Sequence, residues 1–566
     1  MRAICVSVLL SLAGQSEADV LRVDPAASPG GDGSSWGRAY DSLHDALAAA
    51  RPGDELWVKL GQYVPRIPSS QDATFLVPAG VQLYGGFLGN ETQRGQRDPD
   101  SFPTELNGDD FANTIVTIGG NNAVIDGFII TEGMADGSGA AGSRGAGVYG
   151  DNVSVTLRNI EFQDNNATAG SAVTLEGNAA IPSIIENCAF QANSSGYAVQ
   201  VEVPVTIINC TFRNIGSGSI QLRGAVTHSV VGSTFEDHGG FANINVNTQP
   251  GSFTEIDGCI FIDNVSSTAG AVRYFGSGTH ELRNSIIRGN EGTASALGSG
   301  GVVDNLLETS DSLLIENVLF TGNKSAQGAA IRKEDAGSLT VIGCTLVGNE
   351  SVGAVGAGMS VTGTGPVLIA NTIIYGNITG GNLNDERESV FVGNSASVAA
   401  DRSIIEFLGG GTLLGRIDPI TASLSADPMF ADADGADNVF GTADDNPRLS
   451  PGSPAIDRGN NLFVGPFVFA DVFGQTRFLD DTGTPDTGVA GGISAIVDIG
   501  ALEFQGTTPS DCVADTNGDG MLAPNDFNAW ILAFNNQTPA CDQNGDGQCL
   551  PNDFNAWILN FNNGCG

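Results

Sequence analysis

Two segments near the C-terminus have the residue spacing of calcium-binding loops. Each spans twelve residues, 515–526 and 542–553, with oxygen-bearing side chains at positions 1, 3, 5 and 12 and glycine at position 6. Alternate residues of such a loop direct oxygens toward one ion, and position 7 contributes its backbone carbonyl. We therefore expect two Ca²⁺ ions, bound by Asp515, Asn517, Asp519, Met521 and Asp526 in the first loop and by Asp542, Asn544, Asp546, Gln548 and Asp553 in the second.

The residues around these loops form a duplicated module. The sequence Phe-Asn-Ala-Trp-Ile-Leu follows each loop, at 527–532 and at 554–559. The only charged residues between 512 and 566 are aspartates, and all of them fall at predicted ligand positions. The pattern predicts a short helix after each calcium loop.

This pair of loops resembles a dockerin, the duplicated calcium-loop module that attaches secreted enzymes and surface proteins to cohesin receptors. Aspartate at loop position 12 and a helix only after each loop both fit that family. The resemblance implies a cohesin-like receptor or a cell-envelope component as partner. One departure concerns loop positions 10 and 11, which are often small hydroxyl residues in dockerins and are Pro524-Asn525 and Pro551-Asn552 in this chain.

The module also contains four cysteines, Cys512, Cys541, Cys549 and Cys565. In a small exported domain they indicate two disulfides, for which three pairings are possible. A dockerin brings its two chain ends together, so the resemblance favours Cys512–Cys565 with Cys541–Cys549.

Composition and the N-terminus indicate an exported protein. The 566 residues include 24 Lys plus Arg against 64 Asp plus Glu, for a net charge of -40. Such acidity argues against nucleic acid and anionic membranes as partners, because both require basic side chains. Arg2, the apolar stretch 3–13 and the small residues near 16–18 predict a signal peptide over 1–18. No later apolar run is long enough for a membrane span, so we expect a secreted or cell-surface protein.

Between residues 120 and 410 one short phrase recurs about every 22 to 33 residues, which indicates a solenoid. Short alternating strands, an inward residue at every second position and few helical patterns predict an all-β parallel β-helix. An asparagine recurs at one place in each repeat, where we expect it to adopt the left-handed turn and to bond the asparagine of the next coil. Its copies are Asn165, Asn193, Asn264, Asn290, Asn323, Asn349 and Asn377. Cysteines at another shared position should be buried thiols, namely Cys188, Cys210, Cys259 and Cys344.

The Phe-x-x-Asn phrases, such as 162–165 and 190–193, resemble the polymorphic outer-membrane protein repeat. Segment 42–58 resembles the helix-then-strand start of right-handed pectate-lyase-like β-helices, with Leu43, Leu47 and Ala50 facing inward at the open end. Segment 449–504 is similar to the C-terminal part of bacterial surface β-helix proteins. Together with the signal peptide at 1–18, these resemblances imply a capped parallel β-helix at 19–410, its C-terminal end and cap at 411–505, a linker at 506–511 and the dockerin-like module at 512–566.

A catalytic β-helix needs carboxylates that converge with a base on one outer face. The column two residues before each central repeat position instead reads Arg158, Glu186, Ile208, Asp257, Arg283 and Glu316. Alternating signs favour a solvent-facing ladder of ion pairs, each worth about 0–1 kcal/mol, over a catalytic cluster.

The remaining polar residues suggest no site of their own. We expect His44, His228, His238 and His280 to be ordinary surface or turn residues, and Asp109-Asp110 and Asp480-Asp481 to lie in solvated loops. A denser acidic run spans 432–437 and 444–446. Within it Asp432, Asp434 and Asp437 could hold calcium, but the spacing completes no twelve-residue loop and a solvated turn is favoured.

Two functions remain open. The favoured one is a non-catalytic secreted or cell-surface protein, carbohydrate-binding or adhesive, anchored through the calcium-dependent module. The alternative is a polysaccharide lyase or glycoside hydrolase of pectate-lyase-like fold that the same module delivers.

Overall fold

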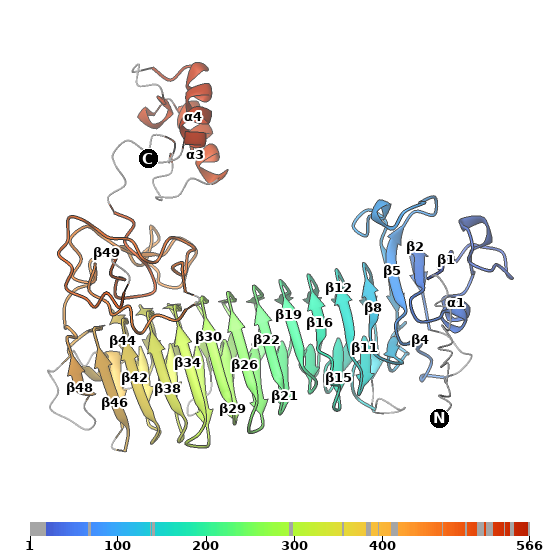
Figure 1. The fold of residues 1–566 in the computed structure, drawn as a ribbon, viewed down its shortest axis with the longest axis horizontal. Coiled ribbons are helices and arrows are strands. Elements are labelled where there is room, and N and C mark those ends of the chain that lie inside the picture. The colour runs from blue at the N-terminus through green and yellow to red at the C-terminus, as the bar shows by residue number, and fades with distance from the viewer. Residues whose placement is uncertain are drawn as a thin grey trace, which may run out of the picture.

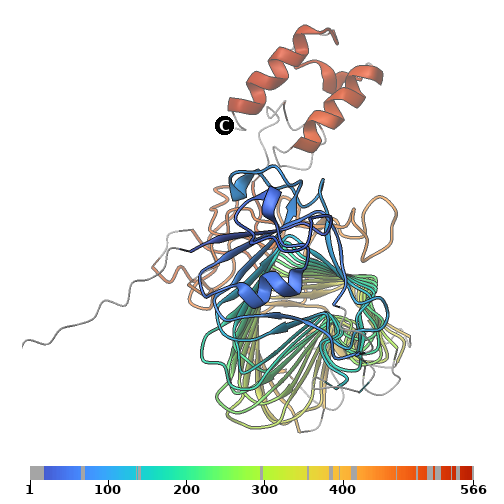
Figure 2. The same ribbon diagram turned by 90° about the vertical axis from the view of Figure 1, so that its right-hand side faces the viewer.

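The computed structural model describes residues 18–65, 70–135, 137, 142–293, 298–353, 356–380, 386–393, 395–408, 417–466, 468–492, 495–506, 514, 516, 524–536, 538–543 and 548–563. Most of them form an elongated solenoid of short parallel strands (Figure 1). Viewed from its end, the strands surround a closed interior (Figure 2). The predicted all-β parallel solenoid is confirmed. The predicted signal peptide lies outside the described residues, apart from Ala18.

Three long sheets run the length of the solenoid. The first has 15 strands. They are, in spatial order, β1 (Val20–Val23), β2 (Glu55–Lys59), β5 (Gln82–Phe87), β8 (Ala123–Asp126), β12 (Val155–Arg158), β16 (Ser183–Glu186), β19 (Val205–Ile208), β22 (Thr227–Val231), β26 (Phe253–Asp257), β30 (Thr279–Arg283), β34 (Ser312–Glu316), β38 (Ser338–Ile342), β42 (Pro366–Ala370), β46 (Ser397–Asp401) and β48 (Ile417–Thr421).

The second sheet has 13 strands, reached from the first by a short turn. They are β3 (Gly61–Tyr63), β6 (Thr104–Asn107), β9 (Ile129–Thr131), β13 (Glu161–Gln163), β17 (Ala189–Gln191), β20 (Thr211–Arg213), β23 (Thr234–Glu236), β27 (Ile260–Ile262), β31 (Ile286–Arg288), β35 (Leu319–Thr321), β39 (Thr345–Val347), β43 (Ile373–Tyr375) and β47 (Ile404–Ile405).

The third sheet has 12 strands and completes each coil. They are β4 (Phe75–Val77), β7 (Val116–Ile118), β11 (Val148–Asp151), β15 (Val173–Glu176), β18 (Val199–Val201), β21 (Ile220–Gly224), β25 (Ile244–Thr248), β29 (Val272–Gly276), β33 (Val302–Leu306), β37 (Ile331–Lys333), β41 (Met359–Val361) and β45 (Val390–Val392).

Two-residue strands form smaller parallel sheets between the second and third. One is the pair β10 (Met134–Ala135) and β14 (Asn166–Ala167). The other contains β24 (Gly239–Gly240), β28 (Val265–Ser266), β32 (Glu291–Gly292), β36 (Lys324–Ser325), β40 (Glu350–Ser351) and β44 (Ile378–Thr379).

Alternation of side chains along each strand builds the core. In β12, Val155 and Leu157 are buried while Thr156 and Arg158 face outward. Inward residues of successive coils therefore stack in columns. One column consists of Phe162, Phe190, Phe212, Phe235 and Phe261, whose rings stack with centroids 4.5–4.9 Å apart. The four repeat cysteines are free and buried, as predicted.

Buried asparagines form the predicted ladder between coils. The Asn290 amide donates to Asn323 Oδ1 at 3.0 Å, and the Asn323 amide donates to Asn349 Oδ1 at 2.9 Å. The expectation that these same residues adopt the left-handed turn was wrong. The positive φ falls on their predecessors, such as Asp164 and Asp263, and on a second set of asparagines after the first-sheet strands: Asn159, Asn187, Asn209, Asn284, Asn317 and Asn371.

Helix α1 (Leu43–Ala49) closes the N-terminal end of the solenoid. Ser42 Oγ accepts a hydrogen bond from the Asp45 amide at its start. Leu43 and Leu47 are buried in the main core, and Ala50 packs against it, as predicted. The 3-10 turns η1 (Trp36–Arg38) and η2 (Arg94–Gln96) and the short helix α2 (Glu386–Ser389) lie between strands.

After β48 the chain turns back over the solenoid. This C-terminal segment, residues 422–506, contains one antiparallel pair, β49 (Phe430–Asp432) and β50 (Asn446–Leu449), and is otherwise irregular. It lies over the turns that join the first and second sheets (Figure 1). The Asn317 amide donates to Ala470 O, and the Asn371 amide donates to Asn460 O, at 3.1 and 2.9 Å.

The last described residues form the helical module: α3 (Pro524–Asn536), η3 (Pro539–Cys541) and α4 (Asn552–Asn563). Trp530, Trp557 and Ala514 are buried together, with Phe527 packed against them. Cys541 and Cys549 form a disulfide, which matches one of the two favoured pairs. Cys512 and Cys565 lie outside the described residues. No helix in the described parts of the chain is long and apolar enough to cross a membrane.

Candidate functional site

The predicted calcium loops are described only at their edges. Asp515, Asn517, Asp519, Met521, Asn544 and Asp546 lie outside the described residues. Asp526 and Asp553, the position-12 residues, are fully buried in the first turns of α3 and α4. The Asp553 carboxylate accepts from the Gln543 amide at 3.1 Å and from the Leu550 amide at 2.7 Å. It therefore ties the end of the second loop to its beginning, next to Asp542.

Tryptophans join each helix of the module to the start of a loop. The Trp557 indole of α4 donates to Ala514 O at 3.1 Å and to Thr516 Oγ1 at 3.2 Å, on either side of Asp515. The Trp530 indole of α3 donates to Cys541 O at 3.2 Å, next to Asp542. Each helix therefore contacts the segment that begins the loop preceding the other helix.

The charged column of the first sheet has the predicted register. Arg158 lies opposite Glu186 on the neighbouring strand, Asp257 lies opposite Arg283, and Arg283 lies opposite Glu316. Val231 occupies the same position on one further coil, between the coils of Ile208 and Asp257. Arg158 Nε lies 3.2 Å from Glu186 Oε2 in a pair that is partly exposed. This end of the column is the surface ladder that the sequence predicts.

The other end of the column is covered, which corrects the prediction of a solvent-facing ladder. The Glu316 side chain is 2% exposed, and that of Arg283 is 12% exposed. The Gly465 amide, in the C-terminal segment, donates to Glu316 Oε1 at 2.6 Å. Burial raises the pKa of Glu316, while the Gly465 bond and Arg283 oppose that rise.

Arg283 lies among several carboxylates. Its Nη1 is 2.8 Å from Glu281 Oε2, and its Nε is 3.2 Å from Glu316 Oε2. Glu255 is in register with Glu281 on the neighbouring strand, and Asp257 is in register with Arg283. Like charges side by side on a sheet are unfavourable unless a counter-charge lies between them or a function retains them. This group is the strongest catalytic candidate on the described outer face of the first sheet.

Neither lysine nor histidine supplies a free base beside these carboxylates. The three lysines of the sequence all form ion pairs: Lys59 with Asp24, Lys324 with Glu350 and Lys333 with Asp304.

The expectation that the histidines are surface or turn residues was wrong for His228 and His280, which lie in β22 and β30, whereas His238 lies in a turn, as expected, but is not exposed. All three are buried, and desolvation lowers the pKa of each to about 4. His228 and His280 occupy inward positions of their strands, where alternation along the strand overrides their polarity. His238 lies between β23 and β24, and its backbone amide donates to Asn264 Oδ1 of the asparagine ladder.

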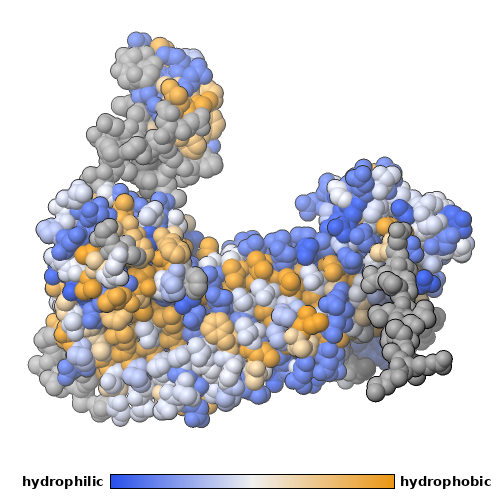
Figure 3. Space-filling view, viewed as in Figure 1, coloured by the Kyte–Doolittle hydropathy of each residue, from blue (hydrophilic) through white to orange (hydrophobic). Residues whose placement is uncertain are grey.

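A hollow lies along the solenoid between its two thick ends. Figure 3 shows it between the C-terminal segment and the N-terminal lobe, which comprises β1, β2, β5 and loop 88–103. We call this hollow the saddle. Its floor includes the exposed turn residues Asn159, Asn187 and Asn209, which stack on successive coils. Within the described chain, the side-chain amides of Asn187 and Asn209 have no protein hydrogen-bond partner.

A groove of about 700 Å³ opens at the N-terminal end of the saddle. Its lining includes Arg97, Asp100, Asn159, Glu161 and Asn187. The Arg97 guanidinium is fixed by Asp126 at 2.7 Å, and Asn159 also donates to that carboxylate at 2.8 Å. The groove therefore presents oriented hydrogen-bonding groups together with an apolar lining from Pro99, Ile160 and Ala189.

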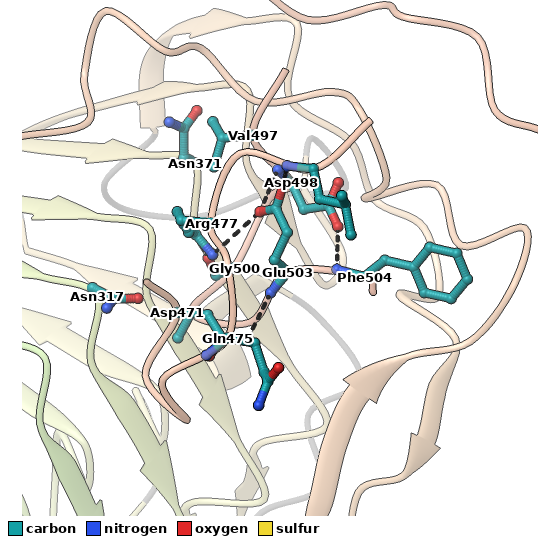
Figure 4. A network of polar contacts seen from close by, with 12 residues as sticks. Asn317, Asn371, Asp471, Gln475, Arg477, Val497, Asp498, Gly500, Glu503 and Phe504 are labelled. Atoms are coloured by element: carbon teal, nitrogen blue, oxygen red, sulfur yellow. Dashed lines mark hydrogen bonds and ion pairs between the residues drawn. The ribbon is translucent and has the colours of Figure 1, made fainter. Parts of the chain in front are cut away.

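A buried charge network holds the C-terminal segment together (Figure 4). Arg477 is the central cation, and its Nη1 lies 3.7 Å from Glu503 Oε2. Asp498 accepts from the Asp457 amide at 2.7 Å and from the Phe504 amide at 2.6 Å. Burial raises the pKa of Asp498 to about 7 and that of Glu503 well above its usual range. These groups are buried in the cover of the solenoid, so they stabilise it rather than face a substrate.

The acidic run at 432–445 behaves as a turn. Asp445 Oδ2 accepts from Thr321 Oγ1 and from the Gly441 amide, both at 2.7 Å, which fixes the turn to β35. A different acidic group converges instead: Asp457, Asp480 and Asp486. The sequence placed Asp480 in a solvated loop and did not single out Asp457. The sequence feature that could have indicated a buried Asp457 is its place directly after the apolar pair Ala455-Ile456.

Comparison with known proteins gives the fold and no closer relationship. A family model described as "Right handed beta helix region" matches residues 144–307 and 205–356. A solved structure titled "Crystal structure of pectate lyase Pel9A" is similar at 16% identity and a TM-score of 0.34, over 86% of this chain and 97% of that one. One titled "Rhamnogalacturonan lyase" is similar at 9% identity and a TM-score of 0.26, over 77% of this chain and 97% of that one. No curated protein matches the chain.

Proposed function

We propose that this chain is a secreted, non-catalytic β-helix protein that binds polysaccharide along the saddle and is attached to a scaffold or cell envelope by a calcium-dependent, dockerin-like helical module. The observation that supports this mode of attachment is the burial of Asp526 and Asp553, the residues at loop position 12. They lie in the first turns of two helices whose tryptophans pack together. Both carboxylates stand at the loop position that binds the ion in this kind of calcium loop, so their placement at the start of each helix favours a metal at each loop.

The C-terminal segment supports the binding role of the saddle. Under this segment, the Asn317 and Asn371 amides donate to backbone carbonyls of an irregular chain that lies across the coils. Asn187 and Asn209 occupy the same turn position in the uncovered half. Successive coils repeat at about 4.8 Å, so these amides could contact an extended polymer at regular intervals. The groove beside Arg97 extends that surface.

Charge and base chemistry favour binding over catalysis. The Arg283 guanidinium is already engaged by Glu281 and Glu316. The lysines form ion pairs, and three of the four histidines are buried. A proton-abstracting base must reach its substrate, and none of these groups meets that condition at the saddle.

A polysaccharide lyase or glycoside hydrolase is the second candidate. The specific observation in its favour is the group Glu255, Asp257 and Glu281 beside Arg283 on adjacent strands. That group lies where the saddle meets the C-terminal segment, within reach of a polymer bound along the coils.

Binding and degradation of polysaccharides can be measured on the same full-length protein. We expect it to be retained by at least one acidic or neutral polysaccharide and to release neither new reducing ends nor unsaturated products. The double variant Asn187→Ala/Asn209→Ala should lose most of that retention. The matched control Asn178→Ala, exposed at a different face, should keep it. Product release that disappears in Glu281→Gln would establish the enzyme instead.

Attachment requires a separate comparison. The full chain and a chain ending at Gly506 are incubated with cell-envelope or cohesin-bearing material, in calcium and in chelator. Polysaccharide binding by the solenoid should give both chains the same background retention. We expect only the full chain, and only in calcium, to be retained above that background. Equal retention of the shorter chain would contradict the proposed role of the module.

A further inference from the structure

A cluster of three carboxylates lies in the C-terminal segment, which precedes the predicted calcium loops in the sequence. Asp457, Asp480 and Asp486 each place a carboxylate oxygen within 4.8 Å of the other two. Two ligands that both lie about 2.4 Å from one ion are at most about 4.8 Å apart, so the three oxygens can bind the same calcium ion. We call these residues the aspartate cage.

Asp457 is the unusual member of the cage. It is fully buried, and neither of its carboxylate oxygens has a hydrogen-bond partner within the described chain. Burial, with the nearby charges of Asp480 and Asp486, raises the pKa of Asp457 to about 6. A buried carboxylate without partners is costly, and such groups in folded proteins are normally paired or bind metals.

The backbone around the cage is fixed on both sides. The Asp457 amide donates to Asp498 Oδ1 at 2.7 Å, and Asp457 O accepts from the Thr487 and Gly488 amides at 3.0 and 3.1 Å. Thr487 O accepts from Arg402 Nη1 at 2.8 Å, next to the end of β46. The Asp457 carboxylate is therefore held toward the loop that carries Asp480 and Asp486.

The negative charge of the cage has no ion-pair partner among the described residues. No described basic side chain forms an ion pair with any of the three aspartates. The neighbouring buried network contains Asp471, Asp498 and Glu503 and has Arg477 as its central cation (Figure 4). Adding a divalent ion at the cage would offset the repulsion among its carboxylates.

We propose that the aspartate cage binds a Ca²⁺ ion, which fastens loop 480–487 to the buried segment around Asp457 and so holds the C-terminal segment over the last coils of the solenoid. Carboxylate oxygens suit a hard cation. Asp480 and Asp486 are exposed, so water can complete a flexible coordination shell, which calcium accepts more readily than magnesium does. The site is independent of the loops in the helical module.

Calcium stoichiometry of the full-length chain tests this proposal by equilibrium dialysis. Asp480→Asn/Asp486→Asn should bind one calcium ion fewer per chain than the wild type. Asp481→Asn should bind the same number, because that carboxylate accepts from Gly483 and Thr484 in its own turn. Both changes lie in an exposed or half-exposed loop, and unchanged β-sheet circular dichroism would verify folding.

The two kinds of site are separated by changing the module as well. Asp519→Ala/Asp546→Ala should remove the ions of the helical module and leave one ion, which the added Asp480→Asn/Asp486→Asn changes abolish. If the wild type and the Asp480→Asn/Asp486→Asn variant bound the same number of calcium ions, the inference about the cage would be overturned. That result would not contradict calcium binding by the helical module. Conversely, an unchanged stoichiometry in Asp519→Ala/Asp546→Ala would contradict the proposed module and not the cage.

Discussion

Arg283 and Glu316 form an ion pair across β30 and β34, with Nε and Oε2 3.2 Å apart, and the C-terminal segment covers the pair. The Gly465 amide, 149 residues further along the chain, also donates a hydrogen bond to Glu316 Oε1 at 2.6 Å. The pair therefore belongs to the interface between the solenoid and its cover.

Replacing Arg283 by methionine should destabilise the protein by about 3 kcal/mol, because it leaves Glu316 buried without its cation. The matched change Arg158→Met removes the same kind of residue from the exposed end of the same column and should cost about 0–1 kcal/mol. Denaturant midpoints of both variants measure the difference. Equal small shifts would mean that Glu316 is solvated in solution.

The asparagine ladder should contribute to stability through hydrogen bonds rather than through turn conformation. Asn323 Oδ1 accepts from both the backbone and side-chain amides of Asn290, and its own amide reaches Ile287 O at 2.8 Å. Asn323→Ala should therefore cost about 2–4 kcal/mol, since it leaves several buried groups unpaired. The exposed Asn178→Ala should change the denaturant midpoint little. A comparable loss in both variants would refute a special role for the ladder.

Buried histidines should make the protein sensitive to mild acid. Desolvation lowers the pKa of His280 to about 4, whereas the unfolded chain protonates near 6.5. The unfolded state then binds more protons between these values, so stability falls as the pH drops from about 6.5 to 4, by at most about 3 kcal/mol.

Comparing His280→Phe with the wild type isolates this effect. The variant should lose less stability than the wild type over that pH range. The comparison is needed because Asp498, whose pKa burial raises to about 7, favours the folded state at low pH and acts in the opposite direction. His44→Phe, at a half-buried site against Phe75, should change the pH dependence less. Parallel pH profiles for His280→Phe and the wild type would contradict the assignment.

Much of the solenoid could be predicted from its sequence because its determinants are local. The two-residue alternation in strands such as β12 sets which side chains face inward, and the recurring Phe-x-x-Asn phrase sets the register of Phe162 on Phe190 and of Asn165 on Asn193. The buried histidines were missed because polarity was given more weight than position in the strand. His228 alternates with Val230 toward the core.

The C-terminal segment could not be predicted in the same way. Its contacts join residues far apart in sequence, such as Glu316 with Gly465 and Asn371 with Asn460. No repeat sets where this irregular chain lies on the solenoid. The covered end of the charged column and the convergence of Asp457 with Asp480 and Asp486 both follow from that path, so neither could be read from spacing.

Calcium titration of the full-length chain, followed by tryptophan fluorescence, tests the account most directly. Each loop of the helical module contains three aspartates, so their repulsion should oppose folding of the module until metal binds. Trp530 and Trp557 lie at the junctions of its helices and loops and should report that folding. We predict a saturable change that chelator reverses and that is absent from Trp530→Phe/Trp557→Phe, which retains Trp36 and Trp57. No change in the folded wild-type protein would contradict a calcium-dependent module.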